Sequence, residues 1–314
     1  MKIPIRFLAA FLPILAGVPQ GCTKNDLIIE DFRGNGSGGD TASGTQVIHF
    51  YPRVGGYGGG GSLNMTPFPE GCRVQAFAFT QGIQLTQWAY YQSLSAGTLS
   101  PLDEPLLLAQ GTYDIYLVST KSSADPPVFH QGKATALTNG VDYLWYGLRA
   151  SVLRNTTNIP VNFTHSMSQL VINVTNAPGE QVAEWIQYAM MGAPALTATT
   201  GWDLYNGKIA PTGVVRGDSL IVMAASGLTC QQIILPIEGV TDLYVYLNMK
   251  IAGENEYRGY PLSLPLPSGR FMGGYSYHYD VEFMKDSVYV NPVNIASWIE
   301  VDEEGQPLYP DIEN

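Results

Sequence analysis

The sequence predicts an all-β protein made of two β-sandwich domains in tandem, on three observations. The first is composition, because 34 Gly, 21 Pro and 19 Tyr with only 14% charged residues are typical of turn-rich sheets rather than helix bundles. The second is length, since 314 residues exceed what one hydrophobic core usually serves. The third is a strict alternation of apolar and polar residues over 275–283.

Residues 275–283, with the sequence YSYHYDVEF, give the clearest strand. Successive side chains of a strand point to opposite faces. We expect a buried face that holds Tyr275, Tyr277, Tyr279, Val281 and Phe283. We expect a solvated face that holds Ser276, His278, Asp280 and Glu282. The alternative, a platform of exposed tyrosine rings for a ligand, is disfavoured because so complete an alternation is typical of a half-buried strand.

Further strand signals, bounded by Gly, Pro and Asn, fill the rest of the chain. In the first half they cover 46–51, 73–80, 112–119 and 141–150. After these they cover 159–164, 168–175, 183–191, 218–225, 230–236, 242–251, 257–264, 275–284 and 286–290, of which 183–191 fits a strand or a short helix. A boundary near Asn158 gives each half enough strands for its own sandwich. We therefore predict an N-terminal domain over 46–158 and a C-terminal domain over 159–300.

The N-terminus has the pattern of a secretion signal. Lys2 and Arg6 provide positive charge ahead of a short apolar run, 7–18, which is too short to span a bilayer. The run leads to VPQGC, which resembles the lipobox of bacterial lipoproteins, whose cysteine becomes the lipid-carrying first residue. We predict a signal peptide over 1–21 and lipid attachment at Cys22. The alternative is an ordinary thiol at a cleaved end.

Polar segments flank the predicted domains. Residues 22–45 are expected to form a flexible tether, because 34–45 are almost all small and polar. Residues 301–314 form an acidic C-terminal tail that contains Pro307 and Pro310.

Charge, cysteine and histidine usage exclude several function classes. The net charge is −11 and the 16 Lys and Arg residues are scattered, which argues against a nucleic-acid partner. Cys72 and Cys230 lie far apart, without metal-ligand spacing. An exported protein could pair them in a disulfide, but each lies in a different predicted domain, so we expect two buried single thiols. The four histidines are likewise dispersed. We expect no metal and no other cofactor.

Two short motifs suggest other activities but lack the context that these need. RGDSL at 216–220 contains an Arg-Gly-Asp triplet and a Gly-Asp-Ser-Leu string, yet nothing late in the chain completes a catalytic triad with Ser219. We expect Gly217 and Asp218 to form a turn before the next strand. GGYGGGG at 55–61 satisfies G-x-G-x-x-G but lacks the following helix, so we expect a loop.

Three segments together resemble the fimbrillin-like family, the type V pilus subunits and related surface lipoproteins of Gram-negative gut and oral bacteria. The C-terminal hallmark of that family is G-x-x-Y-x-Y-x-Φ-x-Φ, with Φ apolar, followed by a hairpin and I-x-x-W. In this sequence its positions are Gly274, Tyr277, Tyr279, Val281, Phe283, Ile295 and Trp298. VNFTHSMSQLVINVT at 161–175 and LAQGTYDIYLVS at 108–119 are similar to further family motifs.

The resemblance implies two transthyretin-like Greek-key β-sandwiches and a non-enzymatic role as a fimbrial subunit or cell-surface adhesin. It implies a lipid-anchored, surface-exposed protein of the outer membrane and the fimbrium, with other pilus subunits and a host or bacterial surface receptor as partners. His165 and Trp298 are expected to be packing residues. Thr41, in Asp40-Thr41-Ala42, resembles an O-glycosylation site of exported proteins in this bacterial group, with an ordinary tether residue as the alternative.

Assembly by donor-strand exchange is the most specific implication. In polymerising members an Arg- or Lys-specific protease cuts after a basic residue, the first strand leaves, and another subunit's strand takes its place. Arg53 and Val54 are the expected cleavage pair, directly after strand 46–51. The alternative is an uncut first strand, as in an anchor subunit, because removal would expose an apolar groove. The prolines of the acidic tail make it a poor donor.

The alternative function is that of a surface glycan-binding lipoprotein of a polysaccharide-uptake system. Its candidate sugar platforms are Trp88, Tyr90, Tyr91 and Trp202. Such a site requires coplanar, exposed rings in a shallow cleft, whereas a pilin is expected to bury most of them.

Overall fold

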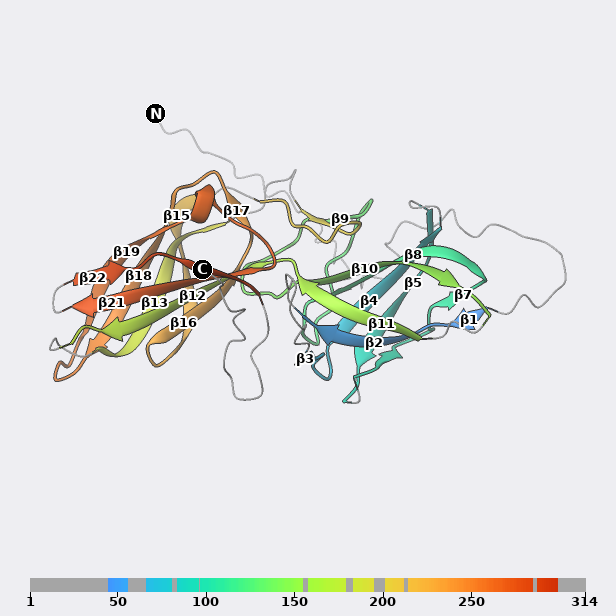
Figure 1. Cartoon of the computed structure of the whole chain (residues 1–314), viewed down its shortest axis with the longest axis horizontal. Helices are drawn as coiled ribbons and strands as arrows, with labels where there is room; N and C mark the ends of the chain where they lie inside the picture. The colour runs from blue at the N-terminus through green and yellow to red at the C-terminus, as the bar shows by residue number, and fades with distance from the viewer. Residues whose placement is uncertain are drawn as a thin grey trace, which may run out of the picture. The chain divides into compact units, whose positions relative to one another are not determined.

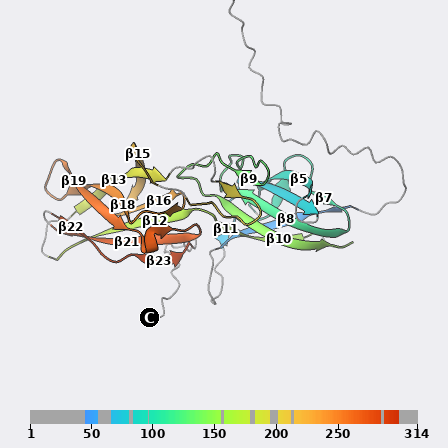
Figure 2. The same ribbon diagram turned by 90° about the horizontal axis from the view of Figure 1, so that it is seen from above.

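The computed structural model describes residues 45–55, 66–80, 84–95, 97–154, 158–178, 183–194, 201–211, 214–284 and 287–298. All of them belong to one compact unit, Ala42–Asn314. Figures 1 and 2 show the chain in two perpendicular views, and strands dominate both. The all-β prediction is confirmed. One short 3₁₀ helix, η1 (Pro267–Gly269), is the helical element within the described residues.

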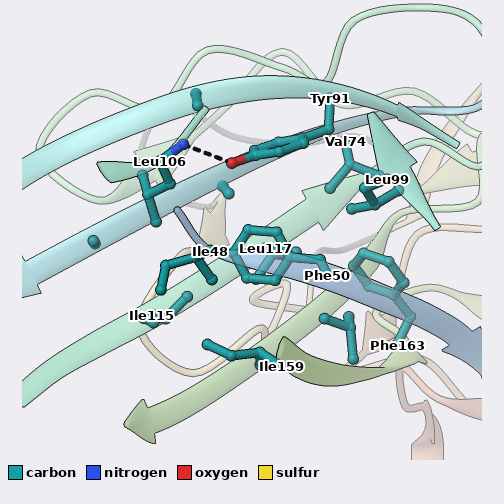
Figure 3. Close-up of a cluster of buried hydrophobic side chains, with 14 of the residues drawn as sticks. Ile48, Phe50, Val74, Tyr91, Leu99, Leu106, Ile115, Leu117, Ile159 and Phe163 are labelled. Carbon is teal, nitrogen blue, oxygen red and sulfur yellow. Dashed lines mark hydrogen bonds between the residues drawn. The ribbon is translucent and has the colours of Figure 1, made fainter. Parts of the chain in front are cut away.

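The first large sheet has eight strands in the order β3-β2-β11-β10-β8-β4-β5-β6 (Figure 1). They are β2 (His49–Val54), β3 (Thr66–Pro67), β4 (Arg73–Thr80), β5 (Gln84–Ser93), β6 (Leu99–Pro101), β8 (Gly111–Ser119), β10 (Leu144–Val152) and β11 (Asn158–His165). The exposed and buried residues of β2 alternate along its whole length, because one face of the strand is turned to the core. The core that it faces contains Phe50, Tyr91, Leu117 and Phe163 (Figure 3).

The second large sheet has nine strands, eight of them in the order β19-β18-β13-β15-β16-β12-β21-β22, with β23 also paired to β21. They are β12 (Ser168–Asn176), β13 (Ala183–Pro194), β15 (Val214–Ser226), β16 (Thr229–Ile234), β18 (Asp242–Ile251), β19 (Tyr257–Pro265), β21 (Tyr275–Met284), β22 (Ser287–Val290) and β23 (Asn294–Ser297). This sheet encloses a separate core that includes Leu170, Leu247, Phe271 and Tyr279.

Three two-stranded ladders complete the described fold. They are β1 (Gln46–Val47) with β7 (Leu107–Leu108), β9 (Lys133–Ala134) with β14 (Trp202–Asp203), and β17 (Ile237–Glu238) with β20 (Arg270–Phe271). Within the described strands, only the β2–β11 and β12–β21 pairs are parallel, and every other ladder is antiparallel.

The chain passes from the first large sheet to the second between His165 and Ser168, after the expected boundary at Asn158. Asn158 is the first residue of β11, and β11 pairs with β2 and β10 of the first sheet. The β9–β14 ladder joins residues from both predicted halves. A third core cluster also draws on both, including Phe77 and Val118 from the first sheet and Trp202 from β14. The two sheets therefore have separate main cores and one shared cluster.

The strand expected at 275–284 forms as β21, and its apolar face is largely as expected. Tyr277, Tyr279, Val281 and Phe283 are buried, and Tyr275 is half-buried. The expectation of a solvated opposite face is wrong at Ser276 and His278, which are both buried.

A hydrogen-bonded chain explains the burial of these two polar residues. The Ser276 hydroxyl donates to Gln169 Oε1 at 2.7 Å and lies 2.8 Å from His278 Nε2. Its single hydrogen is committed to Gln169, so the hydroxyl accepts from His278 Nε2–H. Buried polar groups are tolerated when they are hydrogen-bonded in this way.

Two segments differ from the strand predictions or resolve an ambiguity in them. The sequence does not predict β5, because polar residues interrupt its alternation. The register between β4 and β5 shifts between Ala78 and Phe79. Segment 183–191, which fitted a strand or a helix, lies in the strand β13. Cys72 and Cys230 are both buried, as expected, and burial raises the pKa of the Cys72 thiol.

Candidate functional site

The predicted cleavage pair lies inside β2 rather than after a strand. Arg53 is exposed, whereas the Val54 side chain is fully buried. Arg53 is the register partner of Asn162 in β11 and of Pro67 in β3. The expectation that the first strand ends at 51 is therefore wrong, and the peptide bond after Arg53 is part of the sheet.

The buried face of β2 fills the core of the first sheet. Ile48, just ahead of β2, and Phe50 and Val54 within it are between 0% and 1% exposed. The Phe50 ring packs edge-on against Tyr91, with centroids 5.4 Å apart and an interplanar angle of 89° (Figure 3). Burial of each such side chain contributes roughly 1.5 to 3 kcal/mol. Together they are comparable with the net stability of a domain, about 5 to 15 kcal/mol.

The segment around β2 is also joined to the loop that precedes β8. Ile48 N donates to the Leu106 carbonyl at 3.1 Å, next to the β1–β7 ladder. The Leu106 N–H in turn donates to the Tyr91 hydroxyl at 2.7 Å (Figure 3). Burial raises the pKa of this Tyr91 hydroxyl to about 12, so it stays neutral at physiological pH. Residues 46–54 thus contact the first core at two places, Tyr91 of β5 and Leu106 in the loop before β8.

The four rings proposed as sugar platforms do not form one. Trp202 is 0% exposed and Tyr91 is 1% exposed, so both are core residues. Trp88 and Tyr90 are half-buried, and their rings meet edge-on with an interplanar angle of 81°. Stacking of a sugar requires coplanar, open ring faces, and this arrangement does not provide them.

His165 and Trp298, both expected as packing residues, form one buried group. Their rings are stacked with centroids 3.9 Å apart and 10° between planes. His165 Nδ1 lies 2.8 Å from Asp142 Oδ1, and Lys121 Nζ lies 3.8 Å from the other Asp142 oxygen. Asp142 could not be predicted as part of this group, because no sequence spacing links it to His165. The group has the geometry of a structural histidine, which agrees with the sequence-based interpretation.

The Arg-Gly-Asp triplet lies within β15, so the expectation of a turn there is wrong. Met191 of β13 faces Leu220, whereas Ala193 faces Val215, so residues 216–219 span a register irregularity of the β13–β15 ladder. Cys22, Thr41 and the loop motif at 56–61 lie outside the described residues.

The described residues contain no cluster of three or more His, Cys, Asp or Glu side chains arranged to hold a metal ion. Among them, too, no helix has the length and hydrophobicity needed to cross a membrane.

Comparison with known families gives the class of protein. The model of the fimbrillin-like family matches residues 74–298, and the chain belongs to that family. The family of the chain supports a non-enzymatic role as a fimbrial subunit at the cell surface. No curated protein sequence matches the chain significantly.

Solved structures share the fold. A candidate cell adhesion protein from Bacteroides ovatus superposes with a TM-score of 0.62 at 13% identity, covering 82% of this chain and 100% of that one. A candidate cell adhesion protein from Bacteroides uniformis gives a TM-score of 0.59 at 12% identity, covering 81% and 99%. One from Bacteroides fragilis gives a TM-score of 0.53 at 17% identity, covering 82% and 99%. At these identities the likeness concerns the fold.

Proposed function

We propose that this protein is a fimbrial subunit that is lipid-anchored through Cys22 during export and is then assembled by exchange of its first strand. In this scheme a protease cuts after Arg53, residues up to Arg53 leave, and a strand of another subunit occupies the vacated groove beside β11. The chain would thus be attached to the outer membrane through Cys22 before the cut, which removes Cys22, and would take its place in the fimbrium afterwards. A host or bacterial surface receptor would then be met through the assembled fimbria.

The observation that carries the proposal is the alternating pattern of β2. Its apolar side chains fill a groove in the core, and its backbone pairs along most of β11, from His49–Asn158 to Val54–Phe163. A strand from another chain with the same alternation would satisfy the same backbone groups and the same core positions. The groove therefore specifies both the register and the side-chain pattern of its occupant.

The energy of this burial requires that the first strand be removed and replaced in one coupled process. Ile48, Phe50 and Val54 are almost completely buried, and loss of their burial is comparable with the whole stability of a domain. Without its first strand, the first sheet would not stay folded. The incoming strand must enter as the first strand leaves, which favours a concerted displacement along β11.

The position of Arg53 within the ladder adds a condition on cleavage. Proteases bind an extended, unpaired backbone, whereas β11 flanks Arg53 on one side and the two-residue β3 flanks it on the other. Gly55 N also donates to the Phe163 carbonyl at 3.1 Å, directly beyond the scissile bond. Cutting therefore needs local opening at the end of β2, which the shortness of β3 makes feasible.

Limited proteolysis of the folded, exported protein tests this function. A low dose of trypsin is expected to give a main product that begins at Val54, followed by SDS-resistant oligomers. Arg53→Gln is the matched control and should give neither. Resistance at Arg53 under conditions that cut the exposed turn residue Arg154 would refute strand exchange and leave the uncut anchor role.

Lipid attachment has its own test. Cys22→Ala should move the protein out of the membrane fraction, because a single acylated residue would connect the chain to the membrane in this scheme. Unchanged fractionation of that variant would contradict the anchor. Thr41 remains a proposed O-glycosylation site, to be checked by the intact mass of wild type against Thr41→Ala.

A further inference from the structure

A cavity of about 450 Å³ lies beside the third core cluster, and strand exchange makes no use of it. Its walls come from the ends of β10 and β11, from the segment 206–211, and from the β17–β20 ladder with the residues that follow it. The volume falls in the range of small-molecule sites, about 300 to 1,000 Å³.

Apolar side chains make up much of the lining. They include Ile209, Ile237 and Phe271, which are all buried, together with the partly exposed rings of Trp145 and Tyr275. A ligand that fills this space gains most from an apolar body, because each Å² removed from water contributes about 25 cal/mol.

Several polar groups of the lining already donate their hydrogens to backbone carbonyl groups of the protein. Trp145 Nε1 donates to the Leu204 carbonyl at 2.7 Å. The Ser166 hydroxyl donates to the Gly207 carbonyl at 2.6 Å, and the Thr164 hydroxyl donates to the Trp145 carbonyl at 3.2 Å. The two hydroxyls can still accept a hydrogen bond from a ligand, whereas none of the three groups can donate one without breaking a contact.

The donors that remain are mostly cationic. Lys208 and Arg270 line the cavity and are exposed, and neither forms an ion pair with any described residue. Asn206 Oδ1 accepts a hydrogen bond from the backbone N–H of Lys208 at 2.9 Å, which leaves the side-chain NH₂ of Asn206 to donate. Glu238, opposite Arg270 in the β17–β20 ladder, is the single carboxylate among the described residues of the lining. The rim is thus rich in donors and carries an excess of positive charge.

We propose that this cavity binds a small organic carboxylate with an apolar body. The hydrocarbon or aromatic part packs on Ile209 and its apolar neighbours, and the carboxylate accepts charge-assisted hydrogen bonds from Lys208 and Arg270. Such a ligand would contact both large sheets at once, because Thr164 belongs to β11 of the first sheet and Tyr275 to β21 of the second.

Calorimetric titration of the full chain tests the proposal with 2-naphthoate and its neutral analogue, 2-naphthylmethanol. The carboxylate should bind about tenfold or more tightly than the alcohol, as expected for charge-assisted hydrogen bonds. The double variant Lys208→Gln/Arg270→Gln should lose that preference. The control Lys133→Gln/Arg154→Gln removes the same two charges from exposed positions outside the cavity and should keep it.

Two results would overturn the assignment. One is the absence of saturable 2-naphthoate binding up to millimolar concentration in a chain whose thermal unfolding is that of the folded protein. The other is an equal loss of binding in both double variants, which would make the interaction a consequence of net charge rather than of this cavity. Either result would leave strand exchange untouched, because β2 does not line the cavity.

Discussion

The ring of Trp298 is stacked on the ring of His165, with 3.9 Å between centroids. The two residues come from distant parts of the sequence, and His165 ends β11, the strand that pairs with β2. The contact thus ties the C-terminal end of the described chain to the strand that forms one wall of the β2 groove.

Trp298→Ala should therefore destabilise the fold strongly. Trp298 is 5% exposed, and removal of a buried Trp typically costs about 3 to 5 kcal/mol. Guanidinium unfolding measures the loss. Ile295→Ala, at an exposed position of β23, the strand directly before Trp298, is the control and should change the free energy of unfolding by less than about 0.5 kcal/mol. Similar values for the two variants would contradict the role given to this stack.

The Phe50 position tests how much the first strand contributes to the core. Phe50→Ala should lower the free energy of unfolding by about 3 to 5 kcal/mol, because the ring is fully buried against Tyr91. The neighbouring Tyr51→Ala should cost far less, since that ring is 42% exposed. If urea unfolding gave the same loss of unfolding free energy for both variants, the Phe50 side chain would not be packed in the core.

His278 gives the fold a pH dependence. Burial lowers the pKa of its imidazole, and the nearby Asp280 opposes this only in part. The unfolded chain therefore binds a proton more readily than the folded one, and stability falls as the pH drops below about 6.5, the unperturbed His pKa. The loss ends once the pH is below the lowered, folded-state pKa.

Unfolding measured between pH 7.5 and 5 checks this expectation. His278→Gln should flatten the dependence on pH over that window. The exposed His49→Gln should leave it as in wild type. A His278→Gln variant that keeps the full wild-type slope would assign the pH dependence to other groups.

Substitutions at two glycines distinguish the cost of backbone strain from the cost of a steric clash. Gly207 has a φ of +70°, and an added Cβ would lie 2.3 Å from Cδ2 of Trp145. Gly253 has a φ of +82° with open space around it. Gly253→Ala should cost about 1 to 2 kcal/mol from the left-handed backbone alone. Gly207→Ala should cost clearly more in thermal unfolding, and equal costs would mean that the Trp145 contact is not tight.

Much of the fold could be predicted from the sequence, because period-two patterns are local signals. The core positions Tyr277, Tyr279, Val281 and Phe283 follow from alternation alone. Ser276 was misassigned because its burial depends on Gln169, a partner more than a hundred residues away.

The candidate site was harder to predict for the same reason. The extent of β2 through Val54 depends on its parallel partner β11, and nothing in residues 46–54 identifies that partner. The burial of Trp202 depends on Phe129 and Tyr143, both from the first half of the chain. Contacts between distant segments, which no local pattern encodes, decided both cases.

A disulfide lock on β2 is the most direct test of strand exchange. His49 and Asn158 are exposed register partners in the parallel β2–β11 pair, so cysteines at both positions are suited to a cross-strand bridge. In a Cys22→Ala background, the oxidised His49→Cys/Asn158→Cys chain should still be cut after Arg53 by trypsin, but it should form no SDS-resistant oligomers. Reduction of the bridge should restore them to the level of the unlocked chain. Equal oligomer formation with the bridge intact would contradict the account, because the first strand would then not have to leave.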